Sequence, residues 1–203
     1  VTPAGDTPAE ILATLTAKRA DIAGLSMDTP RIMGILNVTP DSFSDGGLFN
    51  APKAALAHAL EMIGAGADII DIGGESTRPG AQTVDNADEI NRTAPVIAAI
   101  RAGSNVPISI DTRKADVALA ALNAGATLVN DVAAMSYDAE MAAMTAKSGA
   151  PICLMHASGD PETMQNDPKY DNVLLDVYDF LAARVAEAEA AGIPRDLIVI
   201  DPG

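Results

Sequence analysis

Six short apolar runs along the chain each end in a polar side chain that forms hydrogen bonds. The residues at these ends are Asn37, Asp71, Asp111, Asn130, His156 and Asp201. Between the runs lie Ala-rich segments in which apolar residues recur with the spacing of amphipathic helices. This alternation predicts strands and helices that follow one another around a parallel sheet. Because the carboxyl ends of parallel strands converge on the active site of such folds, we expect these polar residues to line a site for a polar small molecule.

Glycine and proline positions set the expected boundaries of the elements. The predicted strands begin near Arg31 and then lie at about 68–72, just after Pro107, and at about 127–130, 151–155 and 197–200. The predicted helices run from about residue 51 to Gly64 or Gly66, around Ile90 to Ile100, and over about 114–123, 138–147 and 170–191. Three joints from helix to strand have the same chemistry, Gly66-Ala67, Gly125-Ala126 and Gly149-Ala150.

Two α/β architectures fit six such units: an incomplete (β/α)₈ barrel, or a doubly wound open sheet. No Gly-x-Gly-x-x-Gly motif follows the first strand, which argues against a dinucleotide-binding sheet. Residues 1–30 are predicted to be a lead-in and residues 31–203 one domain. The last apolar run ends close to Gly203, whereas domain boundaries usually fall in exposed linkers. We therefore expect the domain to continue beyond this residue.

The composition limits the partners of the chain. Its formal net charge is −15 and its pI is about 4.2, so nucleic acid and anionic membrane surfaces are unfavourable partners. The sequence contains neither an apolar run of membrane-spanning length nor a secretory signal pattern. The single Cys153 allows no disulfide within the chain, which favours a cytoplasmic location. An anionic substrate would need local cations, helix N-termini or a metal ion to balance its charge.

The first cluster of candidate residues runs from Asn37 to Gly47, directly after the first strand. It combines hydroxyls, carboxylates, an aromatic ring and a Gly pair in a short segment. Phe43 is suited to stack on a flat ligand, and Asn37 to bind a metal or a phosphate oxygen. The alternative is an ordinary polar loop between a strand and a helix.

The second cluster runs from Asp71 to Gly80. Its glycines let backbone N–H groups approach an anion closely. Ser76 and Thr77 add hydroxyl donors, and Arg78 adds a planar cation that suits phosphate or carboxylate. The alternative is a Gly/Pro turn with a surface arginine.

The third cluster consists of polar residues at later strand ends, Asp111, Asn130 and Asp201. A carboxylate accepts two hydrogen bonds side by side, which suits the amine and ring N–H of a 2-amino-pyrimidinone, and an amide both donates and accepts. Each residue alone is also compatible with a structural role, whereas three on one rim favour a ligand. Met155 is a candidate wall against a flat ring or a core residue.

Two further cations follow the third strand. Arg113 and Lys114 have two interpretations from sequence alone: they cap the next helix, or they attract phosphate.

Together these segments closely resemble the dihydropteroate synthase family. The matching segments are Met33 to Gly47 (MGILNVTPDSFSDGG), Asp71 to Gly80 (DIGGESTRPG), Ser109 to Arg113, Val129 to Val132, Leu154 to His156 and Asp201 to Gly203. They occur in the order found in the family and extend over residues 31–203. The resemblance implies a (β/α)₈ barrel with six of its eight units in this chain. It also implies a folate-pathway transferase that joins 4-aminobenzoate to a dihydropterin methyl diphosphate and releases pyrophosphate.

The resemblance also implies roles for the strand-end residues. Asp111, Asn130 and Asp201 would bind the pterin, and Met155 would lie against its face. Asn37 would help to hold Mg²⁺ and pyrophosphate. In the family, residues of the seventh and eighth strands complete this site, and these strands would follow Gly203. The 203 residues alone are therefore expected to have little or no synthase activity.

The loop residues complete the implied site. Thr77 and Arg78 would lie near the diphosphate and the aminobenzoate. Phe43, Asp45 and Pro79 would shape the aminobenzoate site. Mg²⁺ and hydrogen-bond donors would balance the charge of the leaving pyrophosphate. A carboxylate such as that of Asp45 or Asp111 would stabilise the cationic pterin methylene that the arylamine attacks.

Two other functions fit these motifs less well. One is a non-catalytic homologue that only binds pterin, and another is the pterin-binding domain of a corrinoid methyltransferase. The intact loops after the first and second strands favour the synthase, because a methyltransferase needs no pyrophosphate site. Family membership further implies a homodimer and inhibition by sulfonamides, which mimic aminobenzoate.

Overall fold

A computed structural model describes residues 8–39, 51–76, 83–157 and 170–203. In these residues the strands are β1 (Met33–Asn37), β2 (Ile69–Gly73), β3 (Ile108–Asp111), β4 (Leu128–Asp131), β5 (Ile152–Met155) and β6 (Ile198–Asp201). The helices are α1 (Ala9–Thr16), α2 (Ala51–Gly64), α3 (Asn86–Gly103), α4 (Ala115–Ala124), α5 (Met141–Ser148) and α6 (Val173–Ala190), with a short 3₁₀ helix, η2 (Arg195–Leu197). The predicted elements are therefore present, with boundaries that differ from the predictions by a few residues at most.

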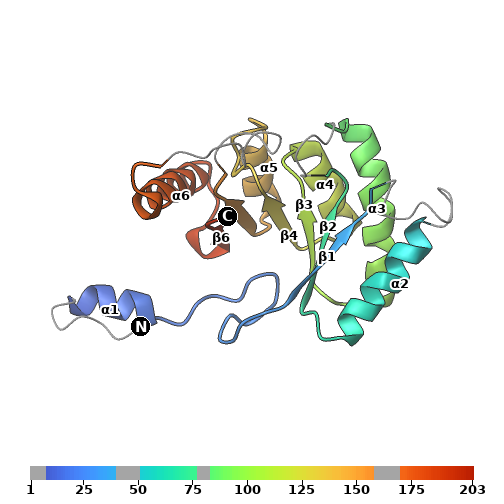
Figure 1. The fold of residues 1–203 in the computed structure, drawn as a ribbon, viewed down its shortest axis with the longest axis horizontal. Helices are drawn as coiled ribbons and strands as arrows, with labels where there is room; N and C mark the ends of the chain where they lie inside the picture. Colours follow the sequence, from blue (N-terminus) through green and yellow to red (C-terminus); the bar gives the residue numbers. More distant parts are fainter. Residues whose placement is uncertain (1–7, 40–50, 77–82, 158–169) are drawn as a thin grey trace.

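The order of the strands distinguishes between the two architectures that the sequence allowed. All neighbouring strands are parallel and lie in the order β1-β2-β3-β4-β5-β6 (Figure 1). A doubly wound sheet reverses its strand order at a switch point, whereas a barrel adds each new strand beside the last. The predicted barrel fold is therefore confirmed for six of its units, which form an open sheet in this chain.

The helices α2 to α6 cover one face of this sheet in chain order, each next to its neighbour (Figure 1). The core lies between the helices and the sheet. Its strand residues include a fully buried apolar row that is paired in register from β1 to β5, namely Leu36, Ile72, Ile110, Val129 and Ile152. Burial of each such side chain contributes roughly 1.5–3 kcal/mol. This layer fixes the register, because a slip by one residue would turn the apolar row away from the helices.

The opposite face of the sheet presents polar residues. Side chains alternate along a strand, so the residues next to the buried apolar row point away from the helices. This inner row consists of Asn37, Gly73, Asp111, Asn130, Cys153 and Val199, which are paired in register from β1 to β6. The packing that buries the apolar row therefore also places the candidate polar residues on a common face.

The glycines at the three predicted joints adopt the left-handed conformation that ends helices. The φ angles of Gly66, Gly125 and Gly149 are +105°, +115° and +70°. At Gly125 the backbone N–H donates to the carbonyl groups of Ala121 and Leu122 at the end of α4. The predicted joints are thus confirmed, with glycine tolerating the positive φ that lets each helix turn into the next strand.

The helix predicted at about 170–191 is present as α6, and its apolar stripe is only partly buried. Leu181 and Ala188 of α6 are buried, but Leu174 in its first turn is 75% exposed. The helix packs against β5, β6 and α5. None of the helices in the described residues has the length and apolar character that a membrane span requires.

Candidate functional site

Three of the predicted site residues share the inner row at the carboxyl ends of the strands. Asn37 on β1 is paired with Gly73 on β2, Gly73 with Asp111 on β3, and Asp111 with Asn130 on β4. Side chains that are in register on neighbouring parallel strands point to the same side of the sheet. The structure therefore brings Asn37, Asp111 and Asn130 together on one face, as the sequence predicted.

Gly73 leaves an opening in the middle of this row. A Cβ atom at this position would lie 3.4 Å from Oδ1 of Asn37 and 3.4 Å from Oδ2 of Asp111. The missing side chain thus leaves space between an amide oxygen and a carboxyl oxygen. Both are hard oxygen ligands, which suit a small divalent cation or the polar edge of a ligand.

The prediction that Asp71 ends the second strand is wrong. The strand continues to Gly73, so Asp71 lies within β2, where it is paired with Ile35 and Ser109. Asp71 is only 5% exposed, and its carboxyl oxygens accept hydrogen bonds of 3.3 and 3.5 Å from Nδ2 of Asn130. Asp71 therefore lies beneath the inner row and orients the Asn130 amide, whose oxygen is left to accept from another partner.

Met155 and Asp201 lie one step nearer the carboxyl ends of the strands. They are register partners at the ends of β5 and β6, two residues after Cys153 and Val199 of the inner row, and so point to the same face. Both are partly buried. The Asp201 carboxylate accepts a hydrogen bond of 2.9 Å from the backbone N–H of Gly203. The predicted pterin residues are therefore on one face, with Asp201 nearer the rim than Asp111 and Asn130.

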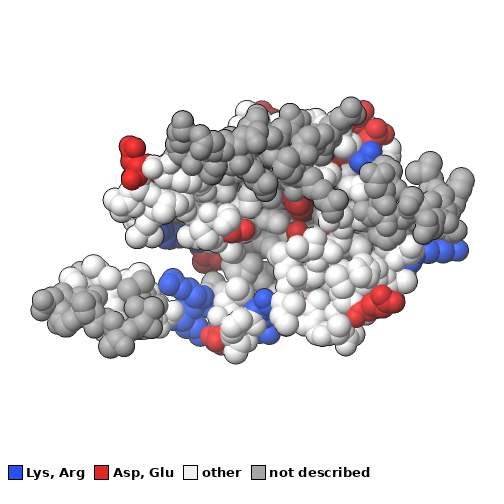
Figure 2. Space-filling view, in the orientation of Figure 1, with Lys and Arg blue, Asp and Glu red and all other residues white. Residues whose placement is uncertain are grey.

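The inner face is electrostatically acidic. Burial raises the pKa of the Asp111 carboxyl to about 8, with further increases from the nearby charges of Asp71 and Glu89. Burial also raises the pKa of Asp71, partly offset by hydrogen bonds from Ser109 and Asn130. In Figure 2, acidic side chains are visible at the centre of the molecule, where its surface is hollowed. A ligand that donates N–H groups or carries positive charge would relieve this repulsion.

Cys153 indicates how far this acidic environment extends. Burial raises the pKa of its thiol to about 12, with contributions from the charges of Asp201, Asp71 and Asp131. Carboxyl groups from β2, β4 and β6 are therefore close enough to affect one side chain in the middle of the sheet. The thiol itself stays protonated at neutral pH and is a poor nucleophile.

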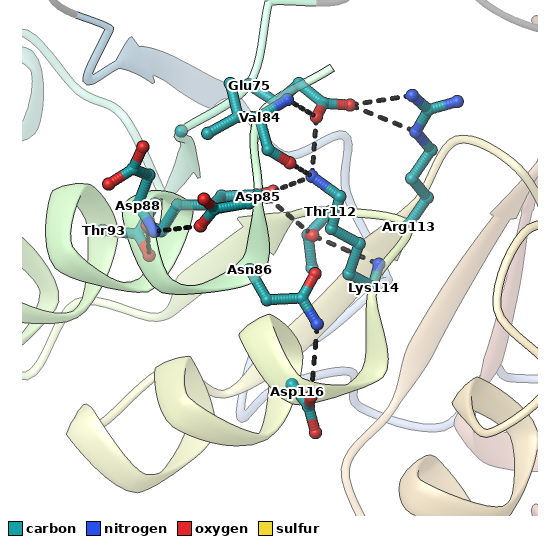
Figure 3. Close-up of polar contacts among 12 residues, drawn as sticks. Glu75, Val84, Asp85, Asn86, Asp88, Thr93, Thr112, Arg113, Lys114 and Asp116 are labelled. Carbon is teal, nitrogen blue, oxygen red and sulfur yellow. Dashed lines mark hydrogen bonds and ion pairs between the residues drawn. The ribbon is translucent and has the colours of Figure 1, made fainter.

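A second polar group, called here the Lys114 cluster, lies beside the inner row. It consists of Glu75, Val84, Glu89, Thr112, Arg113 and Lys114 (Figure 3). Nζ of Lys114 donates to carboxylate oxygens of Glu75 and Glu89, each at 2.6 Å, and to the carbonyl oxygen of Val84. Lys114 is 4% exposed and Glu89 only 1%. Lys114 thus neither caps a helix with its side chain nor offers its charge to phosphate.

Arg113 is the second cation of this cluster. Its guanidinium nitrogens lie 3.0 and 3.1 Å from Oε1 of Glu75, and its Cζ lies 4.0 Å from the centre of the Tyr137 ring. Burial alone would raise the pKa of Glu75, but the hydrogen bonds from Lys114 and the Val84 N–H, together with the charges of Lys114 and Arg113, lower it below its ordinary value. The sequence left two interpretations open for Arg113 and Lys114; the structure adds a contact that it did not predict, in which both side chains bind Glu75.

Several predicted site residues lie outside the described part of the chain. These are Phe43, Asp45, Thr77, Arg78 and Pro79. Ser76 is described and partly buried, next to Glu75. For the proposed metal, the described residues contain no group of three or more His, Cys, Asp or Glu side chains that would hold an ion.

Gly74 packs against α3, which fixes the start of the segment after β2. A Cβ atom there would lie 2.7 Å from Cγ2 of Thr93 and 3.0 Å from Cγ of Glu89. We predict that Gly74→Ala lowers the free energy of unfolding by about 1–3 kcal/mol through overpacking, measured by urea denaturation. Gly64→Ala is the control, since its Cβ would meet nothing within 4 Å. Equal stability of the two variants would contradict this packing.

Sequence reasoning included Asp71 and Glu75 in the second cluster without identifying their partners, and it missed Glu89. Their partners are far away in sequence: Asn130 is 59 positions from Asp71, and Lys114 is 39 from Glu75. The local signals were the carboxylate of Asp71 in an apolar run and that of Glu75 after two glycines. Such a residue predicts a buried partner without identifying it.

Comparisons with known proteins agree with this geometry. The sequence profile of a family described as pterin binding enzyme matches residues 33–203. A dihydropteroate synthase of Synechocystis is 49% identical over 172 residues, which are 85% of this chain and 60% of that protein. The solved structure of Xanthomonas albilineans dihydropteroate synthase with 4-aminobenzoic acid has 46% identity and a TM-score of 0.83, covering 93% of this chain and 67% of the other.

A second structure from that organism, in complex with 7,8-dihydropteroate, has 41% identity and a TM-score of 0.77, over 88% of this chain and 62% of the other. The chain thus spans about three fifths of the length of its curated relatives. The matched region includes every strand of the sheet and the whole inner row. The chain therefore belongs to the family of pterin-binding enzymes.

Proposed function

We propose that this protein is a dihydropteroate synthase, which joins 4-aminobenzoate to (7,8-dihydropterin-6-yl)methyl diphosphate and releases pyrophosphate. The observation that carries this proposal is the common inner face of Asp111, Asn130 and Asp201. The relatives named dihydropteroate synthase support it, as do the neighbouring structures that contain 4-aminobenzoic acid and 7,8-dihydropteroate.

The inner face suits the polar edge of a pterin. A carboxylate accepts two parallel N–H groups, and a 2-amino-pyrimidinone presents two in one plane. Asp111 and Asp201 supply such acceptors, and the Asn130 amide, oriented by Asp71, supplies a further acceptor. Met155, the register partner of Asp201, supplies an apolar surface for the flat ring. The donors of the ligand would replace the repulsion among the buried acids with hydrogen bonds.

The proposed cofactor is Mg²⁺, held in part by Asn37. Mg²⁺ is usually bound by one or two protein oxygens together with substrate phosphates and water. The opening at Gly73, with Oδ1 of Asn37 on one side and Oδ2 of Asp111 on the other, fits this mode. When bound, the ion would balance the negative charge of the diphosphate leaving group.

The loop residues keep the roles that the resemblance implies. Thr77 and Arg78 follow Glu75 and Ser76 in sequence, and we propose that they bind the diphosphate and the aminobenzoate. Phe43, Asp45 and Pro79 are proposed to shape the aminobenzoate site. Asp45 or Asp111 would stabilise the positive charge on the pterin methylene while the arylamine attacks. The homodimer and the cytoplasmic location stay predictions.

A direct assay tests the proposed activity. The full-length protein is incubated with the pterin diphosphate, Mg²⁺ and labelled 4-aminobenzoate, and labelled dihydropteroate is measured. We expect product that depends on both substrates. Binding of pterin by calorimetry without any product would instead indicate a pterin-binding protein that is not a synthase.

Asp201→Asn is predicted to weaken pterin binding at least tenfold. An amide presents one donor and one acceptor where the ligand needs two acceptors, so one hydrogen bond is lost and one donor faces another donor. The measurement is calorimetric titration with a dihydropterin. Asp196→Asn in η2 is the control, since it removes the same charge from an exposed position. Unchanged affinity in Asp201→Asn would remove this residue from the site.

A further inference from the structure

The Lys114 cluster joins both ends of the segment that follows β2. Glu75 lies at the start of this segment, two residues after the strand, and Val84 lies near its end, just before α3. Nζ of Lys114 bonds to both, at the Glu75 carboxylate and the Val84 carbonyl. In addition, the backbone N–H of Val84 donates to Oε2 of Glu75 at 2.8 Å. The two ends are therefore tied to each other and to one cation.

The same cation connects these ends to the rigid part of the fold. Lys114 precedes α4 and also binds Glu89 of α3, whose other oxygen accepts a hydrogen bond of 2.7 Å from Thr112. Thr112 directly follows Asp111 of the inner row. A nearly buried ammonium with three acceptors has little freedom to move, because each bond that breaks leaves a charge without a partner. The cluster thus links the ends of the segment to the strand that presents Asp111.

We propose that Lys114 is a positioning residue for the reaction: it ties Glu75 and Val84 to β3 and α3, and thereby fixes the two points between which Thr77 and Arg78 lie in the sequence. This inference rests on the proposed synthase function, because the segment contains Thr77 and Arg78. Lys114 touches no proposed substrate and acts through Glu75 and Val84. It is distinct from the pterin residues, whose loss reduces binding of the pterin itself.

Two measurements on the full-length protein test the proposal, with Lys114→Met as the main variant. The first is hydrogen exchange of peptides from residues 75–84, compared with peptides from β3 and β4. At exchange times too short for global unfolding, we expect at least tenfold faster exchange in the segment and little exchange in the strands of either protein. The second separates turnover from binding: kcat/KM for 4-aminobenzoate should fall at least tenfold, whereas pterin affinity should stay within threefold.

Further variants keep the test decisive. Lys114→Arg, which retains the charge, should recover part of the lost turnover. Glu75→Gln retains the shape of the side chain and repeats both measurements if Lys114→Met does not fold. Lys147→Met removes a charge from an exposed position of α5 and should change neither measurement.

The outcomes distinguish this proposal from the proposed function. At these short exchange times, equally faster exchange in all peptides would show a merely structural role and overturn the proposal, as would a parallel loss of pterin affinity and turnover. Unchanged exchange in residues 75–84 would also overturn it, even if the wild-type protein makes dihydropteroate. If the wild-type protein makes none, the synthase function fails, and with it the role in the reaction; selective exchange in the variant would then support the tether alone.

Discussion

Asp111→Asn should stabilise this chain at pH 8, although it removes a residue of the proposed site. The pKa of Asp111 is raised from 3.8 to about 8, first by burial and then by Asp71 and Glu89. Since one pKa unit corresponds to about 1.4 kcal/mol, we expect the variant to gain at least about 1.4 kcal/mol in free energy of unfolding at pH 8.

The sign of the pH dependence follows from proton binding. Between pH 4 and pH 8 the unfolded chain has an ionised Asp111, whereas the folded chain holds the proton, so the wild-type protein loses stability as the pH rises through this range. An asparagine does not titrate. The advantage of Asp111→Asn should therefore be present at pH 8 and shrink toward pH 4, measured by urea denaturation at several pH values. A gain that is independent of pH would contradict a raised pKa at Asp111.

The same substitution should impair function. Two N–H donors of a bound pterin would favour the ionised carboxylate of Asp111 over the protonated form of the free chain. An amide cannot accept both donors, so we expect pterin affinity to fall at least tenfold in calorimetric titrations. Stability gained together with binding lost is the signature of a charged group retained for its ligand rather than for the fold. Asp116→Asn, at an exposed position in the first turn of α4, is the control for both measurements.

Lys114→Met should have the largest effect on stability, a loss of about 3–5 kcal/mol at neutral pH. The side chains of Lys114 and Glu89 are 5% and 1% exposed, so removing the ammonium leaves the Glu89 carboxylate buried without its cation. Glu75 loses less, because Arg113 also binds it. The measurement is the free energy of unfolding from denaturant titration. The exposed Lys147→Met should change it by no more than about 0.5 kcal/mol.

A double substitution tests the cause of this loss. Adding Glu89→Gln to Lys114→Met removes the unpaired charge and keeps an acceptor for Thr112. We therefore expect the double variant to be more stable than Lys114→Met alone, by about 0.5–3 kcal/mol. A double variant that is less stable than the single one would show that lost packing, rather than an unpaired charge, explains the effect.

The sequence predicted the parts of the fold that depend on local signals. Pro107 and Gly125 mark the start of β3 and the end of α4, and both boundaries are confirmed within a residue or two. Asp111 and Asn130 follow apolar runs, and both lie in the inner row as expected. These predictions succeed because periodicity and backbone preferences are encoded in neighbouring residues.

The remaining features depend on partners that are distant in sequence. Asp71 divides the apolar run of the strand predicted at about 68–72, and its partner Asn130 lies 59 positions away. From the sequence, Lys114 is interpreted as a helix cap or a phosphate-binding cation. Its carboxylate partners lie 25 and 39 positions away in the sequence. Leu174 has the periodicity of a buried residue but is exposed, because burial depends on what packs against a helix.

A crystal structure of the full-length protein with a bound dihydropterin tests most directly whether the inner face is the pterin site. We predict that the flat ring lies on this face, with its polar edge within hydrogen-bond distance of Asp111, Asn130 and Asp201. A dihydropterin bound elsewhere, with these three side chains making no contact with it, would contradict the account.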